Sequence, residues 1–167
     1  MAKRYDFVVI GAGLVGCMAS LSISSKNKSV CLIEKNKINK IISDDYCPLS
    51  LSINSVNFLK EKNIWDEDLI KSNPIESLYI KLFNSFNTIK ISTSDINLES
   101  IGQVVDKASF LSHLRNLCKK KKNIDVIDNT ELDIKQLESL SKIYLPNESE
   151  AIDFGQLIVT DGANSKF

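Results

Sequence analysis

Three glycines near the amino terminus are the residues whose type and spacing point most directly to chemistry. Gly11, Gly13 and Gly16 form the pattern Gly-x-Gly-x-x-Gly directly after an apolar run. In this pattern the first glycine permits a tight turn, the second lets the backbone approach a pyrophosphate, and the third lets a helix pack closely. The N–H groups and the positive dipole end of that helix hold phosphate charge. The spacing therefore predicts a dinucleotide-binding turn.

A carboxylate follows the glycines at a spacing suited to the recognition of a ribose. Glu34 lies 18 residues after Gly16, at the end of the apolar run Val30–Ile33. A carboxylate in this place accepts hydrogen bonds from a ribose 2′-hydroxyl, and it repels a 2′-phosphate. We therefore expect FAD or NAD at the site, and not NADP. The glycine pattern alone does not separate FAD from NAD.

Two strands and one helix must position these residues. Tyr5–Ile10 is a short β-rich apolar run, the glycine turn opens a helix that ends near Ser25, and Val30–Ile33 is a second apolar run. A strand, a helix and a strand within about 30 residues predict a right-handed βαβ unit. We assign this dinucleotide-binding unit to residues 1–35.

The rest of the chain does not continue as the alternating βαβ units of a compact NAD domain, and this difference favours FAD. A polar loop over Asn36–Pro48 precedes a predicted helix over 49–63 that has Ser50 or Ser52 as its cap. We expect a hairpin inserted within residues 75–95. The other predicted elements are strands Ile124–Ile127, Lys142–Leu145 and Leu157–Thr160, a helix over Phe110–Cys118, and the hairpin strands Ser77–Phe83 and Thr88–Ser92.

The fold class predicted by this pattern is α/β, a Rossmann-like FAD/NAD(P)-binding fold with inserted strands, in one domain over residues 1–167. Composition narrows the function classes. Lysine plus arginine and aspartate plus glutamate number 21 each, so no excess of positive charge predicts binding to nucleic acid. The four cysteines form no C-x-x-C pair, and with one histidine they predict no metal site. Cys17 and Cys31 lie in apolar stretches, which favours reduced core thiols and the cytoplasm.

Four segments, in this order, resemble the FAD-dependent aromatic-ring monooxygenases, and most closely the ring hydroxylases of ubiquinone biosynthesis. The first is the glycine pattern with Glu34. The second, Leu51–Ser55 with Leu59 and Ile64-Trp65, is similar to a helix of that subgroup. The third is Ile101–Asp106 leading into the helix that follows, and the fourth is Leu157–Ser165 with its Asp161-Gly162 pair.

The resemblance implies roles for individual residues. Gly11, Gly13, Gly16 and Glu34 would bind the ADP half of FAD. Gln103 would lie near the ribityl or ribose region, and Asp161 near the pyrophosphate, in a motif also tied to NAD(P)H use. No side chain is predicted to be catalytic. The whole predicted cofactor-binding set is Gly11, Ala12, Gly13, Leu14, Gly16, Glu34, Lys35, Gln103, Asp161 and Gly162.

The chemistry implied by the resemblance is the hydroxylation of an aromatic small molecule, for which NAD(P)H supplies electrons and O₂ the oxygen atom. The implied substrate is a ubiquinone precursor, and association with a membrane surface or a biosynthetic complex stays open. Two departures bear on this expectation. Cys47 stands where the family has a cofactor-contacting arginine, and the family's later Gly-Asp motif is absent from these 167 residues.

These departures lead us to expect the amino-terminal portion of such an enzyme, inactive alone. Two alternatives stay open. One is another flavin-dependent oxidoreductase of the same fold, and the other is a non-catalytic nucleotide-binding fragment.

Overall fold

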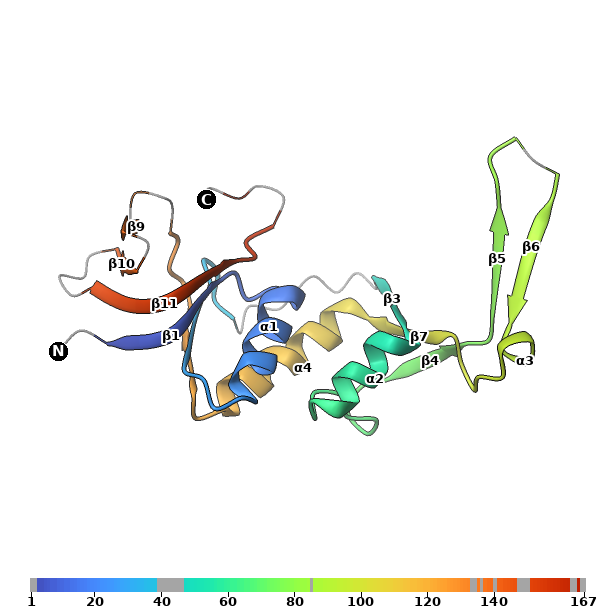
Figure 1. Cartoon of the computed structure of the whole chain (residues 1–167), viewed down its shortest axis with the longest axis horizontal. Coiled ribbons are helices and arrows are strands. Elements are labelled where there is room, and N and C mark those ends of the chain that lie inside the picture. The colour runs from blue at the N-terminus through green and yellow to red at the C-terminus, as the bar shows by residue number, and fades with distance from the viewer. Residues whose placement is uncertain are drawn as a thin grey trace. The chain divides into compact units, whose positions relative to one another are not determined.

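The computed structural model describes residues 3–38, 47–84, 86–132, 135, 137–139, 141–146, 151–162 and 165. The chain forms two compact units (Figure 1). The first unit joins Met1–Ser43 to Leu111–Phe167, and the second is Asp44–Phe110, inserted between them in the sequence. The helix α4 (Lys107–Lys120) carries the chain from the second unit back to the first.

A six-stranded sheet forms the first unit, in the order β8-β2-β1-β11-β10-β9. Figure 1 shows the two longest of these strands, β1 and β11, running side by side. The first four strands are parallel, and β10 and β9 continue the sheet antiparallel. The strands are β1 (Arg4–Ile10), β2 (Val30–Ile33), β8 (Ile124–Ile127), β9 (Leu137–Ser139), β10 (Lys142–Tyr144) and β11 (Ala151–Val159).

The helix α1 (Leu14–Ser24) connects β1 to β2, so the predicted βαβ unit is present. All four residues of β2 and the last three of β1 are buried, as both faces of a parallel sheet require. Val8, Ile10, Cys31 and Ile33 belong to one core cluster that also includes Phe154 of β11. The uninterrupted apolar runs of the sequence therefore form the centre of this sheet, as expected.

The second unit has two small antiparallel sheets. One is ordered β3-β7-β4, from β3 (Pro48–Ser52), β7 (Gly102–Asp106) and β4 (Ser72–Ile75). The other is the hairpin of β5 (Ser77–Lys81) and β6 (Thr88–Ser92), followed by the short helix α3 (Thr93–Ile96). The helix α2 (Ile53–Glu61) buries Val56 and Leu59, and the Trp65 and Phe110 rings lie 6.1 Å apart, centroid to centroid.

The prediction of a helix from residue 49 was wrong at its beginning. Leu49 and Leu51 belong to β3, which pairs with β7, and the helix begins only at Ile53. Of the two predicted caps, Ser52 is the one used, because its hydroxyl accepts a hydrogen bond from the Ser55 N–H at 3.2 Å. Residues 39–46 of the predicted polar loop lie outside the described residues.

Candidate nucleotide-binding site

The carboxyl ends of three parallel strands meet at one edge of the first sheet. Ile10 pairs with Val159 on one side and with Ile33 on the other. The three segments that follow these strands therefore emerge together, and they are the glycine turn, the Thr160-Asp161-Gly162 segment and the Glu34-Lys35 pair. They line a cavity formed by Ile10, Gly11, Gly13, Ile33, Glu34, Lys35, Arg115, Thr130, Glu131, Leu132, Thr160, Asp161 and Gly162.

Two of the three glycines are required by the protein's own packing. Gly11 has φ +97°, and a Cβ atom there would come within 2.6 Å of the Thr160 carbonyl oxygen. A Cβ atom on Gly16 would overlap the Gly11 carbonyl oxygen and approach the Thr160 hydroxyl to 2.6 Å. Gly16 therefore allows α1 to begin against both the turn and the segment after β11, which agrees with its predicted packing role.

Gly13 differs from the other two glycines. Its φ of −76° suits any residue, and a Cβ atom there would meet no atom within 4 Å. Gly13 is the N-cap residue of α1, and no side chain caps this helix. The N–H groups of the first helical turn therefore face space that glycine keeps clear. This arrangement fits a phosphate group, which needs close approach to backbone donors at a helix start.

Glu34 is fixed to the glycine turn by hydrogen bonds. One carboxylate oxygen accepts from the Ala12 N–H at 2.7 Å, and the other accepts from the backbone and side-chain nitrogens of Asn36 at 3.0 and 3.2 Å. The residue is only 7% exposed. Each carboxylate oxygen has two lone pairs, so Glu34 keeps capacity to accept hydrogen bonds from ribose hydroxyls.

The segment after β11 fastens the turn from the other side. The Thr160 hydroxyl lies 2.8 Å from the Ile10 carbonyl oxygen and 3.0 Å from that of Gly11, to which it donates. Gly162 has φ +93°. Sequence reasoning identified Asp161 and Gly162 but not Thr160, although its place directly after an apolar strand was a usable signal. A second cavity adjoins this segment and is lined by Val15, Val159, Thr160, Asp161, Gly162 and Ser165.

Arg115 is a further lining residue that sequence reasoning missed. This half-buried side chain of α4 donates from Nε to the Ala12 carbonyl oxygen at 2.9 Å and from Nη1 to the Ile38 carbonyl oxygen at 3.4 Å. The peptide of Ala12 is thus held at its N–H by Glu34 and at its carbonyl by Arg115. The only signal in the sequence was that the chain has two arginines.

The remaining predicted residues divide between the two units. Lys35 is exposed and lines the cavity of the first unit, and Leu14 begins α1 beside the turn. Gln103 lies on β7 of the second unit, where its side-chain oxygen is buried and lacks a hydrogen-bond partner within the described part of the chain. Its role near the ribityl chain stays a prediction. Ala163 and Asn164 lie outside the described residues.

The described residues give little support for a metal site or a reactive cysteine. Their His, Cys, Asp and Glu side chains form no group of three that could hold a metal ion. Cys17 and Cys31 are buried, as predicted, and burial raises the pKa of the Cys31 thiol to about 12. A thiol with this pKa is a poor nucleophile at neutral pH. None of the described helices has the length and apolar character needed to cross a membrane.

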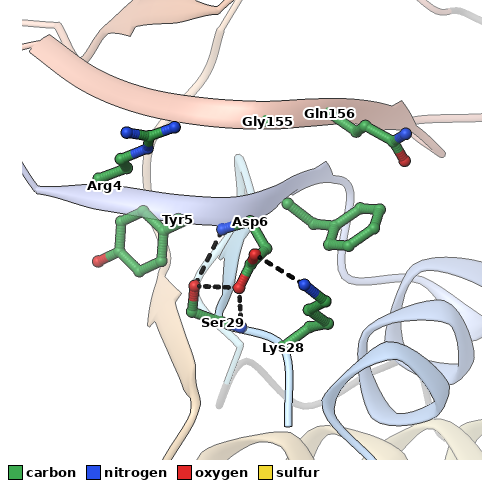
Figure 2. A pocket seen from close by; sticks show the side chains of 8 residues that line it. Arg4, Tyr5, Asp6, Lys28, Ser29, Gly155 and Gln156 are labelled. Carbon is green, nitrogen blue, oxygen red and sulfur yellow. Dashed lines mark hydrogen bonds and ion pairs between the residues drawn. The ribbon is translucent and has the colours of Figure 1, made fainter. Parts of the chain in front are cut away.

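A further cavity lies at the opposite end of the same strands (Figure 2). There, one Asp6 carboxylate oxygen accepts hydrogen bonds from the Ser29 N–H and hydroxyl, both at 2.9 Å. The other carboxylate oxygen lies 3.3 Å from the Lys28 ammonium. These bonds tie β1 to the turn that precedes β2.

Comparison with known proteins assigns the chain to a family. The family described as "Glucose inhibited division protein A" matches residues 6–167. The ubiquinone biosynthesis monooxygenase COQ6 of Dictyostelium discoideum is 27% identical over 96% of this chain and 38% of its own length. The tRNA uridine 5-carboxymethylaminomethyl modification enzyme MnmG of Mycoplasma capricolum is 27% identical over 99% of this chain and 25% of its own length.

Solved structures share the fold. PqsL of Pseudomonas aeruginosa, described as a probable FAD-dependent monooxygenase, superposes with a TM-score of 0.68 at 12% identity, covering 98% of this chain and 44% of that one. The predicted Rossmann-like α/β class is therefore confirmed, and the match to COQ6 agrees with the predicted resemblance to monooxygenases. The chain spans less than half the length of these relatives.

Proposed function

Because this chain belongs to the glucose inhibited division protein A family, we propose that it binds FAD through the glycine turn. We propose further that it is the FAD-binding part of an aromatic-ring monooxygenase. The observation that carries the FAD site is the open space at Gly13, where a Cβ atom would have no atom of the protein within 4 Å. The fold itself does not require a glycine there. A diphosphate lying against the start of α1 does require one.

Each residue of the proposed site has a defined task. The N–H groups at the start of α1 hold the diphosphate, and Glu34 accepts a hydrogen bond from the adenosine ribose. Asp161 and Gly162 line the same cavity from the segment after β11, on the other side of β1 from Glu34, and we propose that they border the rest of the cofactor. When bound, FAD supplies the redox chemistry, while the protein orients it and excludes water. None of these tasks needs a side chain that acts as acid, base or nucleophile.

The substrate class is proposed from the monooxygenase relative. COQ6 of Dictyostelium is described as a ubiquinone biosynthesis monooxygenase, and its similarity to this chain covers 96% of the residues. We propose an aromatic ring of a ubiquinone precursor as the substrate, with O₂ and NAD(P)H as co-substrates. Gln103, from the third segment of the family resemblance, is proposed to contact the ribityl region.

A second function has a specific observation in its favour. MnmG of Mycoplasma capricolum, an enzyme that modifies tRNA uridine, matches 99% of this chain at the same 27% identity. The balanced net charge of the chain argues against this function, because tRNA binding depends on excess positive charge, and Lys119–Lys122 is the longest run of consecutive basic residues in the sequence. A gel-shift titration with tRNA separates the two: binding near micromolar concentration would favour tRNA modification, and its absence would favour the small aromatic substrate.

The cofactor proposal is tested with the purified 167-residue chain. The chain is mixed with FAD, the excess is removed, and the flavin spectrum of the protein fraction is recorded, with a parallel titration of NAD. We expect retained FAD and little affinity for NAD. Preference for NAD, or retention of neither nucleotide, would overturn the proposal. The variant Gly13→Ala is the matched control, because it fills the proposed phosphate position and should retain far less FAD.

A further inference from the structure

We propose that Arg115 is a phosphate-binding residue of the dinucleotide site, in addition to holding the glycine turn in place. The proposal rests on the proposed function, since it assumes that this cavity takes a dinucleotide. It extends that function by assigning the positive charge of the site to α4, an element outside the βαβ unit.

The geometry brings the guanidinium to the turn from a distant part of the sequence. Arg115 Nε donates to the Ala12 carbonyl oxygen at 2.9 Å, 103 residues away in the chain. The Cys17 thiol also donates to this oxygen, at 3.5 Å. The guanidinium therefore lies against the peptide between Gly11 and Gly13, and Arg115 lines the same cavity as both glycines.

The charge of Arg115 is not balanced by its hydrogen-bond partners. Both acceptors are neutral carbonyl oxygens, on Ala12 and Ile38. These two hydrogen bonds use Nε and Nη1, two of the three guanidinium nitrogens. A half-buried cation in this condition favours an anion nearby. A guanidinium with donors left over is well suited to phosphate oxygens.

Competing charges around the cavity do not replace Arg115. The acidic residues that line the cavity are Glu34, Glu131 and Asp161. Lys35 is the other cationic lining residue, and its side chain is exposed. A diphosphate brings two negative charges into a cavity that already holds three carboxylates. The half-buried guanidinium is the group that offsets this charge.

The test compares ADP with adenosine, because the two ligands differ only in their phosphates. Isothermal titration measures the Kd of each ligand for the unaltered chain and for Arg115→Gln. We expect the Kd of ADP to rise about tenfold or more, as for the loss of a charge-assisted hydrogen bond, and that of adenosine to change less than twofold. Arg115→Lys should recover part of the ADP affinity. Arg4→Gln removes the same charge at the far end of β1 and should change neither Kd.

Each other outcome counts against the proposal in a different way. Equal weakening of ADP and adenosine would show that Arg115 only positions the turn. An unchanged Kd for ADP would show that Arg115 does not contact phosphate, while the proposed FAD site would stand. Failure of the unaltered chain to bind ADP or FAD would overturn both proposals. Thermal melts of each variant, with Arg115→Lys as the conservative change, show that the comparison is made between folded proteins.

Discussion

At each end of the parallel sheet in the first unit, a carboxylate beside a cavity accepts backbone N–H groups. At the carboxyl end, Glu34 accepts from Ala12 at 2.7 Å and from Asn36 at 3.0 Å. At the amino end, Asp6 accepts from the Ser29 N–H at 2.9 Å, as Figure 2 shows. Both carboxylates fasten a strand to a neighbouring turn, and a cavity lies beside each. The presence of a carboxylate and a cavity therefore does not distinguish the two ends of the sheet.

The two ends differ in what the protein leaves unsatisfied. At the amino end, Ser29 and Lys28 occupy both oxygens of Asp6, and Gly155 is packed so closely that a Cβ atom would lie 2.8 Å from the Asp6 carbonyl oxygen. At the carboxyl end, α1 has no side-chain cap and Gly13 faces open space. A binding site is thus recognised by its missing partners, and the amino-end cluster is a structural one.

The largest expected effect comes from adding a methyl group where the protein itself fills the space. Gly16→Ala places Cβ against the Gly11 carbonyl oxygen and the Thr160 hydroxyl. We expect it to cost about 3 kcal/mol of unfolding free energy, the upper end for overpacking, and to abolish FAD retention because the turn must move. Urea unfolding followed by circular dichroism measures the cost.

The matched change at the amino end sharpens the comparison. Gly155→Ala meets the Asp6 carbonyl oxygen at 2.8 Å, so it should cost about 1–2 kcal/mol by the same mechanism. FAD affinity should stay the same once the variant is folded. A loss of FAD affinity in Gly155→Ala equal to that in Gly16→Ala would show that the two ends are not functionally distinct.

The next effect separates binding from stability at a single position. Gly13→Ala adds a methyl group in open space, so the cost in unfolding free energy should stay below about 1 kcal/mol, the usual range for an N-cap change. The Kd of FAD should nevertheless rise at least tenfold, because the methyl group occupies the place of a phosphate. Flavin fluorescence quenching measures the Kd. An unchanged Kd of FAD would show that no phosphate occupies the open space at Gly13, and the carboxyl end would then not differ from the amino end as a binding site.

A smaller effect tests the two carboxylates directly. Glu34→Gln keeps the shape of the side chain but removes the charge that repels a 2′-phosphate. We expect the preference for 5′-ADP over 2′,5′-ADP to fall several-fold, measured by competition against bound FAD. Asp6→Asn is the counterpart at the amino end and should leave the preference unchanged. If both variants shift the preference alike, the effect is a general change in charge and not recognition by Glu34.

Sequence reasoning was most successful where local pattern and tertiary structure agree. The apolar runs of β1 and β2 lie on either side of the glycine turn and its helix, and a parallel sheet covered on both faces buries such runs. It was less successful for β11, which begins at Ala151 and not near Leu157. Asp153 and Gly155 interrupt the apolar pattern there, although the glycine is needed for the close approach to β1.

The three-stranded sheet of the second unit was missed for a related reason. Leu49, Ile53, Val56 and Leu59 match a helical period, yet Leu49 belongs to β3. The strand β4 contains Pro74 and has little apolar character, so it carries no strand signal. Arg115 and Thr160 were also missed, because their hydrogen bonds to the turn span 103 and 149 residues. Such contacts depend on the fold and leave no local pattern.

The smallest expected effect is the pH dependence that Asp6 at the amino end contributes to stability. The Ser29 N–H holds the pKa of the Asp6 carboxyl below its ordinary value of 3.8, with further hydrogen bonds from the Ser29 hydroxyl and Lys28. A carboxyl with a lowered pKa in the folded state stabilises the fold above its unfolded pKa, and this contribution is lost as the pH falls towards the folded value. The difference in urea midpoint between the unaltered chain and Asp6→Asn should therefore be constant from pH 7 to about pH 5 and shrink by pH 3. Ser29→Ala should reduce the same pH dependence, since it removes the hydroxyl but keeps the N–H. A difference that persists unchanged to pH 3 would show that Asp6 stabilises the fold through its shape and not through its charge.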